Sequence, residues 1–200
     1  MKILTVADVP AKALWDYYDE SRLKGVDLIL SAGDLPAAYL SFLVTFAPGP
    51  VFYVHGNHDD RYAQKPPEGC ICIDGKLVEY EGVRILGLGG SFRYNDGVNQ
   101  YSEREMAKRV RRLNLSIRRH HGFDILLTHA PAKGQGDLPD LPHQGFETFN
   151  RVMDRWHPKY MIHGHVHMNY AASVPRTRRY GETTIINAYE RYLFDYDDPV

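Results

Sequence analysis

The chain has 200 residues, of which 44% are hydrophobic and 24% are charged, so it is long enough to bury a core without disulfide staples. Its 24 Lys and Arg residues and 25 Asp and Glu residues give a net charge of −1, which excludes the cationic excess of a general nucleic-acid binder. The sequence contains neither a signal-peptide segment nor an apolar run near the roughly 18 residues of a membrane span, and it predicts a cytoplasmic protein.

The first part of the chain alternates strand and helix signals. Short apolar runs at 3–7, 27–32 and 51–54 are typical of buried strands. Helical patterns follow the first two runs, at 11–23 and 36–47. This alternation predicts right-handed crossovers and a parallel sheet.

The middle of the chain has a different character. Strand-like runs at 70–73, 76–80 and 83–88 are separated by Asp-Gly and Glu-Gly pairs, which are hairpin signals and predict antiparallel pairing. The 2 cysteines of the chain, Cys70 and Cys72, are expected in the core, because residues two apart in a strand are poorly placed for a mutual disulfide.

The second half again mixes helices and strands. Residues 102–120 form an amphipathic pattern with a basic outer face, and a second helix is expected at 148–156. Strands are predicted at 124–128 and 160–162, and in the tail near Val174, at 183–187 and at 192–196. We therefore expect a single α/β domain with a mixed sheet over residues 1–200.

Polar residues follow five of the predicted strands at the point where each strand ends. One Asp in such a place is usually a helix cap or a turn former, but five coincidences favour a site, because ligands bind beyond the carboxyl ends of strands in open α/β sheets. The residues are Asp8, Asp34, Asn57 with His58, His129, and His165 with His167.

The spacing and chemistry of these residues point to metal ions. His165 and His167 lie two apart in an extended segment and can therefore lean towards two ions about 3.5–4 Å apart. A carboxylate between the ions would offset their repulsion, and Asp34, which follows a central strand, is the candidate. Oxygen and nitrogen donors without thiolate suit Mn, Fe, Zn or Co.

The ordered motifs resemble those of the calcineurin-like metallophosphoesterases. The resemblance rests on Asp8, Gly33-Asp34, Gly56-Asn57-His58-Asp59, Thr128-His129-Ala130 and Gly164-His165-Val166-His167. It implies a two-sheet β-sandwich of mixed strands flanked by helices, a four-layer α/β fold, with a dinuclear site at one edge.

The resemblance also implies a role for each matching residue. It places Asp8 and His167 on a first divalent ion, Asp34 between the two ions, and Asn57, His129 and His165 on the second. The ions would be Mn, Fe, Zn, Co or Ni. His58 would contact the phosphate and protonate the leaving alkoxide, a role that imidazole commonly has in enzymes. The expected nucleophile is a metal-bound hydroxide.

One position departs from the family pattern. The first motif of the family usually reads Asp-x-His, whereas here it reads Asp8-Val9-Pro10, and proline has no donor atom for a metal. We therefore expect weaker or different metal occupancy at the first site.

Two further segments could contact a substrate. Arg93, Tyr94 and Asn95 follow a glycine-rich turn and could face a phosphoester, and His143 lies in a stretch rich in glycine and proline. The alternative for each segment is a solvated loop, which the first segment favours and which is as consistent with the second as a substrate contact is. The basic face of helix 102–120 is either a solvated surface or a patch for an anionic substrate.

The sequence thus predicts a metal-dependent phosphoesterase that hydrolyses a small phosphomonoester or phosphodiester. Two alternatives remain open. One is a non-catalytic interaction module on the same scaffold, although such modules tend to lack the residue that corresponds to His58. The other is a nuclease that uses the basic helix 102–120.

Overall fold

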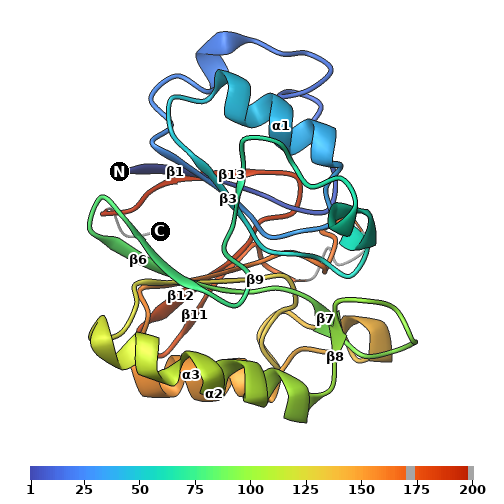
Figure 1. The fold of residues 1–200 in the computed structure, drawn as a ribbon, viewed down its shortest axis with the longest axis vertical. Helices are drawn as coiled ribbons and strands as arrows, with labels where there is room; N and C mark the ends of the chain where they lie inside the picture. The colour runs from blue at the N-terminus through green and yellow to red at the C-terminus, as the bar shows by residue number, and fades with distance from the viewer. Residues whose placement is uncertain (170–173, 198–200) are drawn as a thin grey trace.

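The computed structural model describes residues 1–169 and 174–197. Two β-sheets lie face to face, one helix covers the outer face of the first sheet, and two helices cover the outer face of the second (Figure 1). The expected four-layer arrangement of sheets and helices is confirmed. In the described residues we find no helix both long enough and apolar enough to cross a bilayer.

The first sheet has five strands in the order β13-β1-β2-β3-β4. Strands β1 (Lys2–Val6), β2 (Leu28–Ser31), β3 (Val51–Tyr53) and β4 (Ile71–Cys72) are parallel, and β13 (Tyr192–Asp195) pairs antiparallel with β1. The parallel register places Ile3 opposite Leu28. The predicted parallel sheet at the start of the chain is therefore confirmed.

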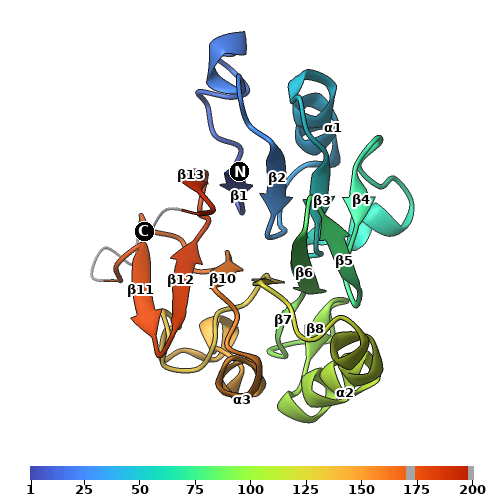
Figure 2. The ribbon, with the colours of Figure 1, turned by 90° about the vertical axis from the view of Figure 1, so that its left-hand side faces the viewer.

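The second sheet has six strands in the order β11-β12-β10-β9-β6-β5 (Figure 2). Strands β6 (Val83–Leu88), β9 (Ile125–Thr128), β10 (Tyr160–His163) and β12 (Thr183–Asn187) are parallel. The edge strands β5 (Leu77–Tyr80) and β11 (Thr177–Tyr180) are antiparallel to their neighbours. A separate pair, β7 (Ser91–Phe92) and β8 (Gln100–Tyr101), is parallel.

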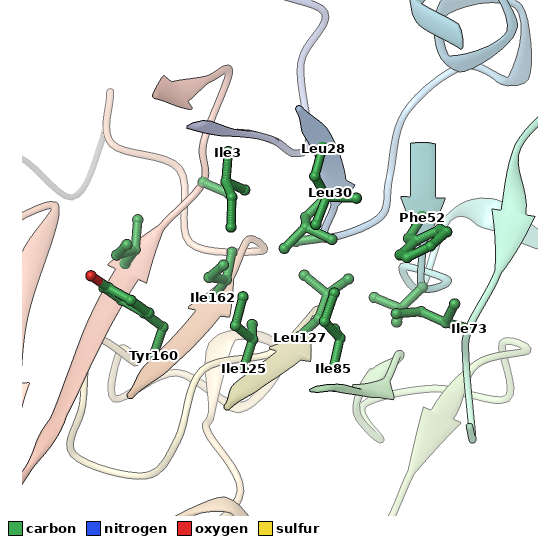
Figure 3. Packing of buried hydrophobic residues seen from close by; sticks show 14 of the residues in the cluster. Ile3, Leu28, Leu30, Phe52, Ile73, Ile85, Ile125, Leu127, Tyr160 and Ile162 are labelled. Atoms are coloured by element: carbon green, nitrogen blue, oxygen red, sulfur yellow. The ribbon is translucent and has the colours of Figure 1, made fainter. Parts of the chain in front are cut away.

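The apolar side chains of the strands alternate between two environments. In β2, Leu28 and Leu30 point between the sheets, while Ile29 packs under the helix outside; in β9, Ile125 and Leu127 point inward (Figure 3). A strand that is buried on both faces reads as a continuous apolar run, and this explains the runs seen in the sequence.

The helices cover the outer faces of the sheets. Helix α1 (Ala37–Phe46) lies over the first sheet, and α2 (Glu103–Arg119) and α3 (Glu147–Trp156) lie over the second (Figure 1). Ser102 and Glu105 form a capping box at the start of α2, which satisfies two otherwise unpaired backbone N–H groups. Three short 3-10 helices are η1 (Glu20–Arg22), η2 (Asp59–Ala63) and η3 (Leu141–His143).

The helix predicted at 11–23 is wrong. Only η1 is helical there, and residues 12–17 form turns in which Tyr17 N–H bonds the carbonyl of Lys12 rather than that of the residue four positions earlier. Trp15 and Tyr18 pack their rings edge-on against Phe42 of α1, with centroids 5.3 and 5.1 Å apart. Aromatic residues are modest helix formers, and this tertiary packing decides the local conformation.

Three smaller expectations also need correction. The first strand of the middle region, β4, pairs parallel with β3, and the antiparallel hairpin is confined to β5 and β6. Val174 lies in a bend before β11. Cys70 and Cys72 are free thiols that are only half-buried beside the apolar cluster under α1, because β4 is the edge strand of its sheet.

Candidate metal centre

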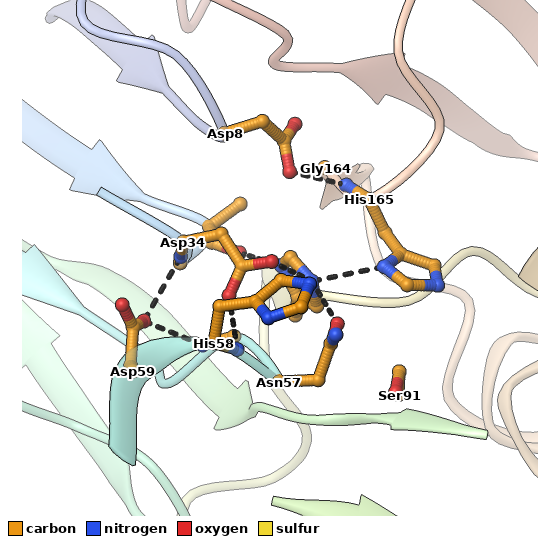
Figure 4. Close-up of polar contacts among 12 residues, drawn as sticks. Asp8, Asp34, Asn57, His58, Asp59, Ser91, Gly164 and His165 are labelled. Carbon is orange, nitrogen blue, oxygen red and sulfur yellow. Dashed lines mark hydrogen bonds and ion pairs between the residues drawn. The ribbon is translucent and has the colours of Figure 1, made fainter. Parts of the chain in front are cut away.

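The polar residues singled out in the sequence meet at one edge of the sandwich. Asp8, Asp34 and Asn57 follow β1, β2 and β3 of the first sheet, whereas His129 and His165 follow β9 and β10 of the second (Figure 4). The carboxyl ends of both sheets thus converge at the same edge. Three of the residues, Asp8, Asp34 and His165, have positive φ angles of 66, 58 and 68°, which non-glycine residues adopt rarely and mostly near functional sites.

Two glycines of the motifs make room for the carboxylates. A Cβ atom on Gly56 would lie 2.0 Å from Oδ1 of Asp34, and one on Gly164 would lie 2.9 Å from Oδ2 of Asp8. Neither glycine has a positive φ, so the reason for glycine at these positions is space rather than backbone conformation.

Backbone amides hold the carboxylate of Asp34 in place. The His58 N–H donates to Asp34 Oδ1 at 2.7 Å. The neighbouring Asp59 accepts from the N–H groups of Asp34 and Gly56 at 2.9 and 2.7 Å. Asp59 therefore fixes the loops after β2 and β3 to each other. Asp59 is the last residue of the Gly56-Asn57-His58-Asp59 motif, and its bond to the distant Asp34 amide has no signal in the sequence.

Two imidazoles face each other across the site. His129 Nδ1 lies 2.7 Å from the carbonyl oxygen of Ala32, and His165 Nε2 lies 2.7 Å from that of Pro142. A carbonyl oxygen only accepts, so the neutral form of each ring carries its proton on that nitrogen. The lone pairs of His129 Nε2 and His165 Nδ1 then point at each other across 3.1 Å.

Either a proton on His129 Nε2 or a metal ion between the two nitrogens resolves this contact between two lone pairs, and a metal ion would displace that proton. Two nitrogens that bind one ion at about 2.1 Å, with a right angle between them, lie about 3.0 Å apart. His129 Nε2 is also 3.3 Å from Asp34 Oδ2 and 2.9 Å from Asn57 Oδ1. Asp34, His129 and His165 each offer a ligand atom within 4.8 Å of the others. These side chains fit a divalent ion.

Asp8 provides a second indication of a cation. Its Oδ1 accepts from the His165 N–H at 2.9 Å, whereas its Oδ2 is buried with no hydrogen-bond partner in the described part of the chain. Burial raises the pKa of Asp8 to about 7. An unpaired buried carboxylate oxygen is costly, and a metal ion would satisfy it. His167 Nε2 lies 4.0 Å from Asp8 Oδ1.

The electrostatics of the site also favour positive charge. Burial opposes ionisation of His129, but the charge of Asp34 outweighs it and raises the pKa of His129 to about 9. Burial likewise lowers the pKa of His165 to about 3, so this ring stays neutral and keeps a lone pair. The negative charge of Asp34 therefore stabilises a positive charge at the point where His129 and His165 meet.

The convergent residues open onto a cavity of about 410 Å³. His58, Tyr94, His143 and His167 line it together with Asp8, Asp34 and Asn57. Tyr94 accepts a hydrogen bond from Asn57 Nδ2 at 3.1 Å. His143 Nδ1 lies 2.5 Å from Asp140 Oδ2.

The structure places two of the candidate substrate residues elsewhere. Arg93 pairs with Glu105 at 3.0 Å, and Asn95 accepts from Gly97 N–H of its own loop and from Gln100 Nε2 of β8. Neither residue lines the cavity beside the five convergent strand ends.

Comparison with known proteins identifies the family. The model of the calcineurin-like phosphoesterases matches residues 1–169, and the chain belongs to this family. The Caenorhabditis elegans UPF0046 proteins C25E10.12 and T07D4.2 are each 37% identical to it, over 93 and 68 residues. These matches cover 38% and 33% of this chain but only 31% and 16% of the relatives' lengths.

The fold is also found among solved structures. The crystal structure of TT1561 of Thermus thermophilus has a TM-score of 0.66 and 16% identity, with 94% of this chain and 89% of that chain covered. This similarity confirms the mixed two-sheet architecture.

Proposed function

We propose that the protein is a metal-dependent phosphoesterase that hydrolyses a phosphomonoester or phosphodiester. The observation that carries the proposal is the convergence of Asp34, His129 and His165 on one point, beside a buried Asp8 oxygen without a partner among the described residues. Membership of the calcineurin-like phosphoesterase family supports the same chemistry.

Two divalent ions would be held by residues from both sheets. Asp8 and His167 would bind the first ion, Asn57, His129 and His165 would bind the second, and Asp34 would reach both. Bound ions of this kind acidify water and neutralise phosphoryl oxygens. The first ion would have fewer protein ligands, because Pro10 stands where the family usually has a histidine, and we expect it to bind more weakly.

His58 would donate a proton to the leaving group. Its backbone N–H is fixed on Asp34, and its exposed side chain lines the cavity between the carboxylates and solvent. A protonated imidazole can give its proton to the departing alkoxide oxygen, and general acids of this kind contribute about 10²–10⁴-fold in rate.

Tyr94 and His143, which lie beside Asn57 and His165 in the lining of the cavity, would contact the substrate. The Tyr94 hydroxyl accepts from Asn57, and this leaves its own O–H available to a phosphoryl oxygen. The Asp140 carboxylate orients the ring of His143 in the same way that a second residue orients many catalytic histidines. Both side chains would bind the phosphate and position it.

The proposal is tested by metal analysis combined with hydrolysis of phenyl and p-nitrophenyl esters. We expect bound Mn, Fe, Zn, Co or Ni, and turnover of a mono- or a diester. His58→Ala should retain its metal and lose about 10² in kcat for the phenyl esters, with a smaller loss for the p-nitrophenyl esters, whose leaving group needs no proton. His121→Ala, which changes an exposed histidine at the end of α2, is the matched control.

Other outcomes would contradict parts of the proposal. Equal losses for both leaving groups in His58→Ala would refute its role as the acid. Absence of turnover with every metal would favour a non-catalytic interaction module. Turnover of DNA or RNA alone, lost on reversal of the charges of Arg111 and Arg112, would favour the nuclease.

A further inference from the structure

A second hollow adjoins the metal-facing cavity. It is a groove of about 950 Å³ between the first residues of α1 and the segment that contains η2. Asp8, Asp34 and His58 line both the groove and the cavity. The two spaces therefore meet at His58, with the proposed metal ligands on one side and the groove on the other.

The groove is largely apolar and is kept open by small side chains. Leu35 is buried at its floor, while Ala37 and Ala38 at the start of α1 add no bulk. Pro10 lines the same groove, so the residue that replaces the family's histidine contributes an apolar wall. Most ligand pockets of this size are apolar with a few polar groups that orient the ligand.

Hydrogen bonds between the walls make the groove a preformed feature. The buried Tyr62 hydroxyl of η2 donates to the carbonyl oxygen of Leu35 and ties the two walls together at the floor. The Glu68 N–H donates to Ser41 Oγ at 2.8 Å and joins the walls again beyond η2. The groove thus has fixed walls and one end at His58.

The charges around the groove disfavour an anionic occupant, because Asp8, Asp34 and Asp59 line it in addition to the residues of its rim. Its outer rim carries the exposed pairs Asp60 and Glu68 against Arg61 and Lys65, two acids and two bases. A second phosphate or carboxylate in the groove would meet no net positive charge there. An uncharged, mostly apolar group fits both the walls and the rim.

We propose that the groove binds the alcohol part of the substrate, and that the substrate is a phosphoester of a bulky, largely apolar alcohol. The inference rests on the proposed function and names the substrate class of the same site. In the reaction, water oxygen bonds to phosphorus and the bond from phosphorus to the alcohol oxygen breaks. His58 gives its proton to that oxygen, and the water proton leaves to solvent, so the products are the free alcohol and the phosphate.

The test compares two leaving groups of similar acidity. Methyl phenyl phosphate and methyl 4-biphenylyl phosphate, with the corresponding monoesters, differ by one ring that the groove would accept. We expect kcat/KM for the biphenylyl ester to be about tenfold higher or more, mainly through KM. In Ala38→Trp the added ring would fill the groove, and the preference should disappear. Ala63→Trp is the same change on an exposed η2 residue outside the lining, and it should keep the preference.

A binding measurement tests whether the groove binds an apolar alcohol independently of whether the protein hydrolyses phosphoesters. Titration of the wild type and both variants with 4-phenylphenol, followed by NMR shifts of the Ala37 and Ser41 amides, needs neither turnover nor metal. Saturable binding that Ala38→Trp abolishes and Ala63→Trp retains supports the groove even if no ester is hydrolysed. Absence of saturable binding to the wild type, or a biphenylyl preference that Ala38→Trp leaves unchanged, overturns the inference.

Discussion

Gly56 shows how a single missing side chain shapes the site. A methyl group at this position would overlap the Asp34 carboxylate, and it would also approach the Asp34 backbone nitrogen to 2.6 Å. The loops after β2 and β3 can come this close only because residue 56 has no Cβ. The position of Asp34 therefore depends on its neighbour as much as on its own backbone.

We expect Gly56→Ala to lose metal binding and to be destabilised by about 1–3 kcal/mol, the usual result of overpacking. Gly49→Ala is the matched control, because its Cβ would overlap the Asp27 carbonyl oxygen, 1.8 Å away, in a turn outside the site. The control should lose stability but keep its metal. Metal content of the folded protein and urea unfolding measure the two effects. Normal metal content in Gly56→Ala would show that Asp34 can move without loss of the site.

At the scale of secondary-structure elements, Asp74 connects α2 to the loops behind the site. Its Oδ1 accepts from Arg109 Nη2 of α2 at 2.5 Å and from the Gly89 N–H at 2.7 Å, and its Oδ2 lies 3.1 Å from His55 Nδ1. Burial alone would raise the pKa of Asp74, but the bond with His55, the charge of Arg109 and the bond from Gly89 hold it below the ordinary value. These contacts give Asp74 a structural role.

This lowered pKa makes a prediction about stability and pH. Folded Asp74 binds its proton less tightly than the unfolded chain, so its stabilisation is present above the unfolded pKa of about 4 and is lost as pH falls through the lower folded pKa. We expect Asp74→Asn to be less stable than the wild type by about 3 kcal/mol at pH 7, and the difference to shrink below about pH 4. Urea unfolding from pH 3 to 8 measures it. Asp16→Asn, an exposed change, should stay within about 0.5 kcal/mol throughout, and a constant difference for Asp74→Asn would contradict the argument.

Elements with strong periodicity could be predicted from the sequence, and those decided by tertiary contacts could not. The apolar runs of β1, β2 and β9 and the amphipathic pattern of α2 carry their own signal. The partner of β4 is set by which edge of the first sheet is free, and nothing in residues 70–73 encodes it. The turns at 12–17 depend on aromatic contacts with α1, which lies more than 20 positions away.

Some residues of the candidate site could likewise be predicted from the sequence, and others could not. Residues that directly follow strands could be grouped from the sequence, because topology alone brings them to one edge. Arg93 and Asn95 could not be placed, because their partners Glu105 and Gln100 come from α2 and β8. The groove beside His58 likewise depends on small side chains at the start of α1, which no motif records.

For the whole molecule, the important feature is that both sheets contribute to the candidate metal centre. Asp8, Asp34 and Asn57 belong to loops of the first sheet, and His129 and His165 belong to loops of the second. A ligand that binds only the folded state stabilises it by mass action, by about 2.7 kcal/mol at 100 times its Kd.

We therefore expect Mn²⁺ to raise the thermal unfolding temperature and EDTA to lower it. The shift should vanish in His129→Ala, which removes a ligand from the second sheet. Arg112→Ala, an exposed change on α2, should keep the full shift. Differential scanning calorimetry across Mn²⁺ concentrations measures these effects. An unfolding temperature independent of Mn²⁺ would show that no ion binds preferentially to the native protein.

The hydrogen bond between Asp8 and the His165 amide joins residues 157 positions apart in the chain. A partially folded intermediate that contains only the first sheet has the carboxylates without the imidazoles, and one that contains only the second has the reverse. Capture of an ion with the native coordination must therefore wait until the last strands have docked. In a refolding experiment, the native metal coordination would therefore appear only when both sheets have folded and docked, and not at the initial collapse of the chain.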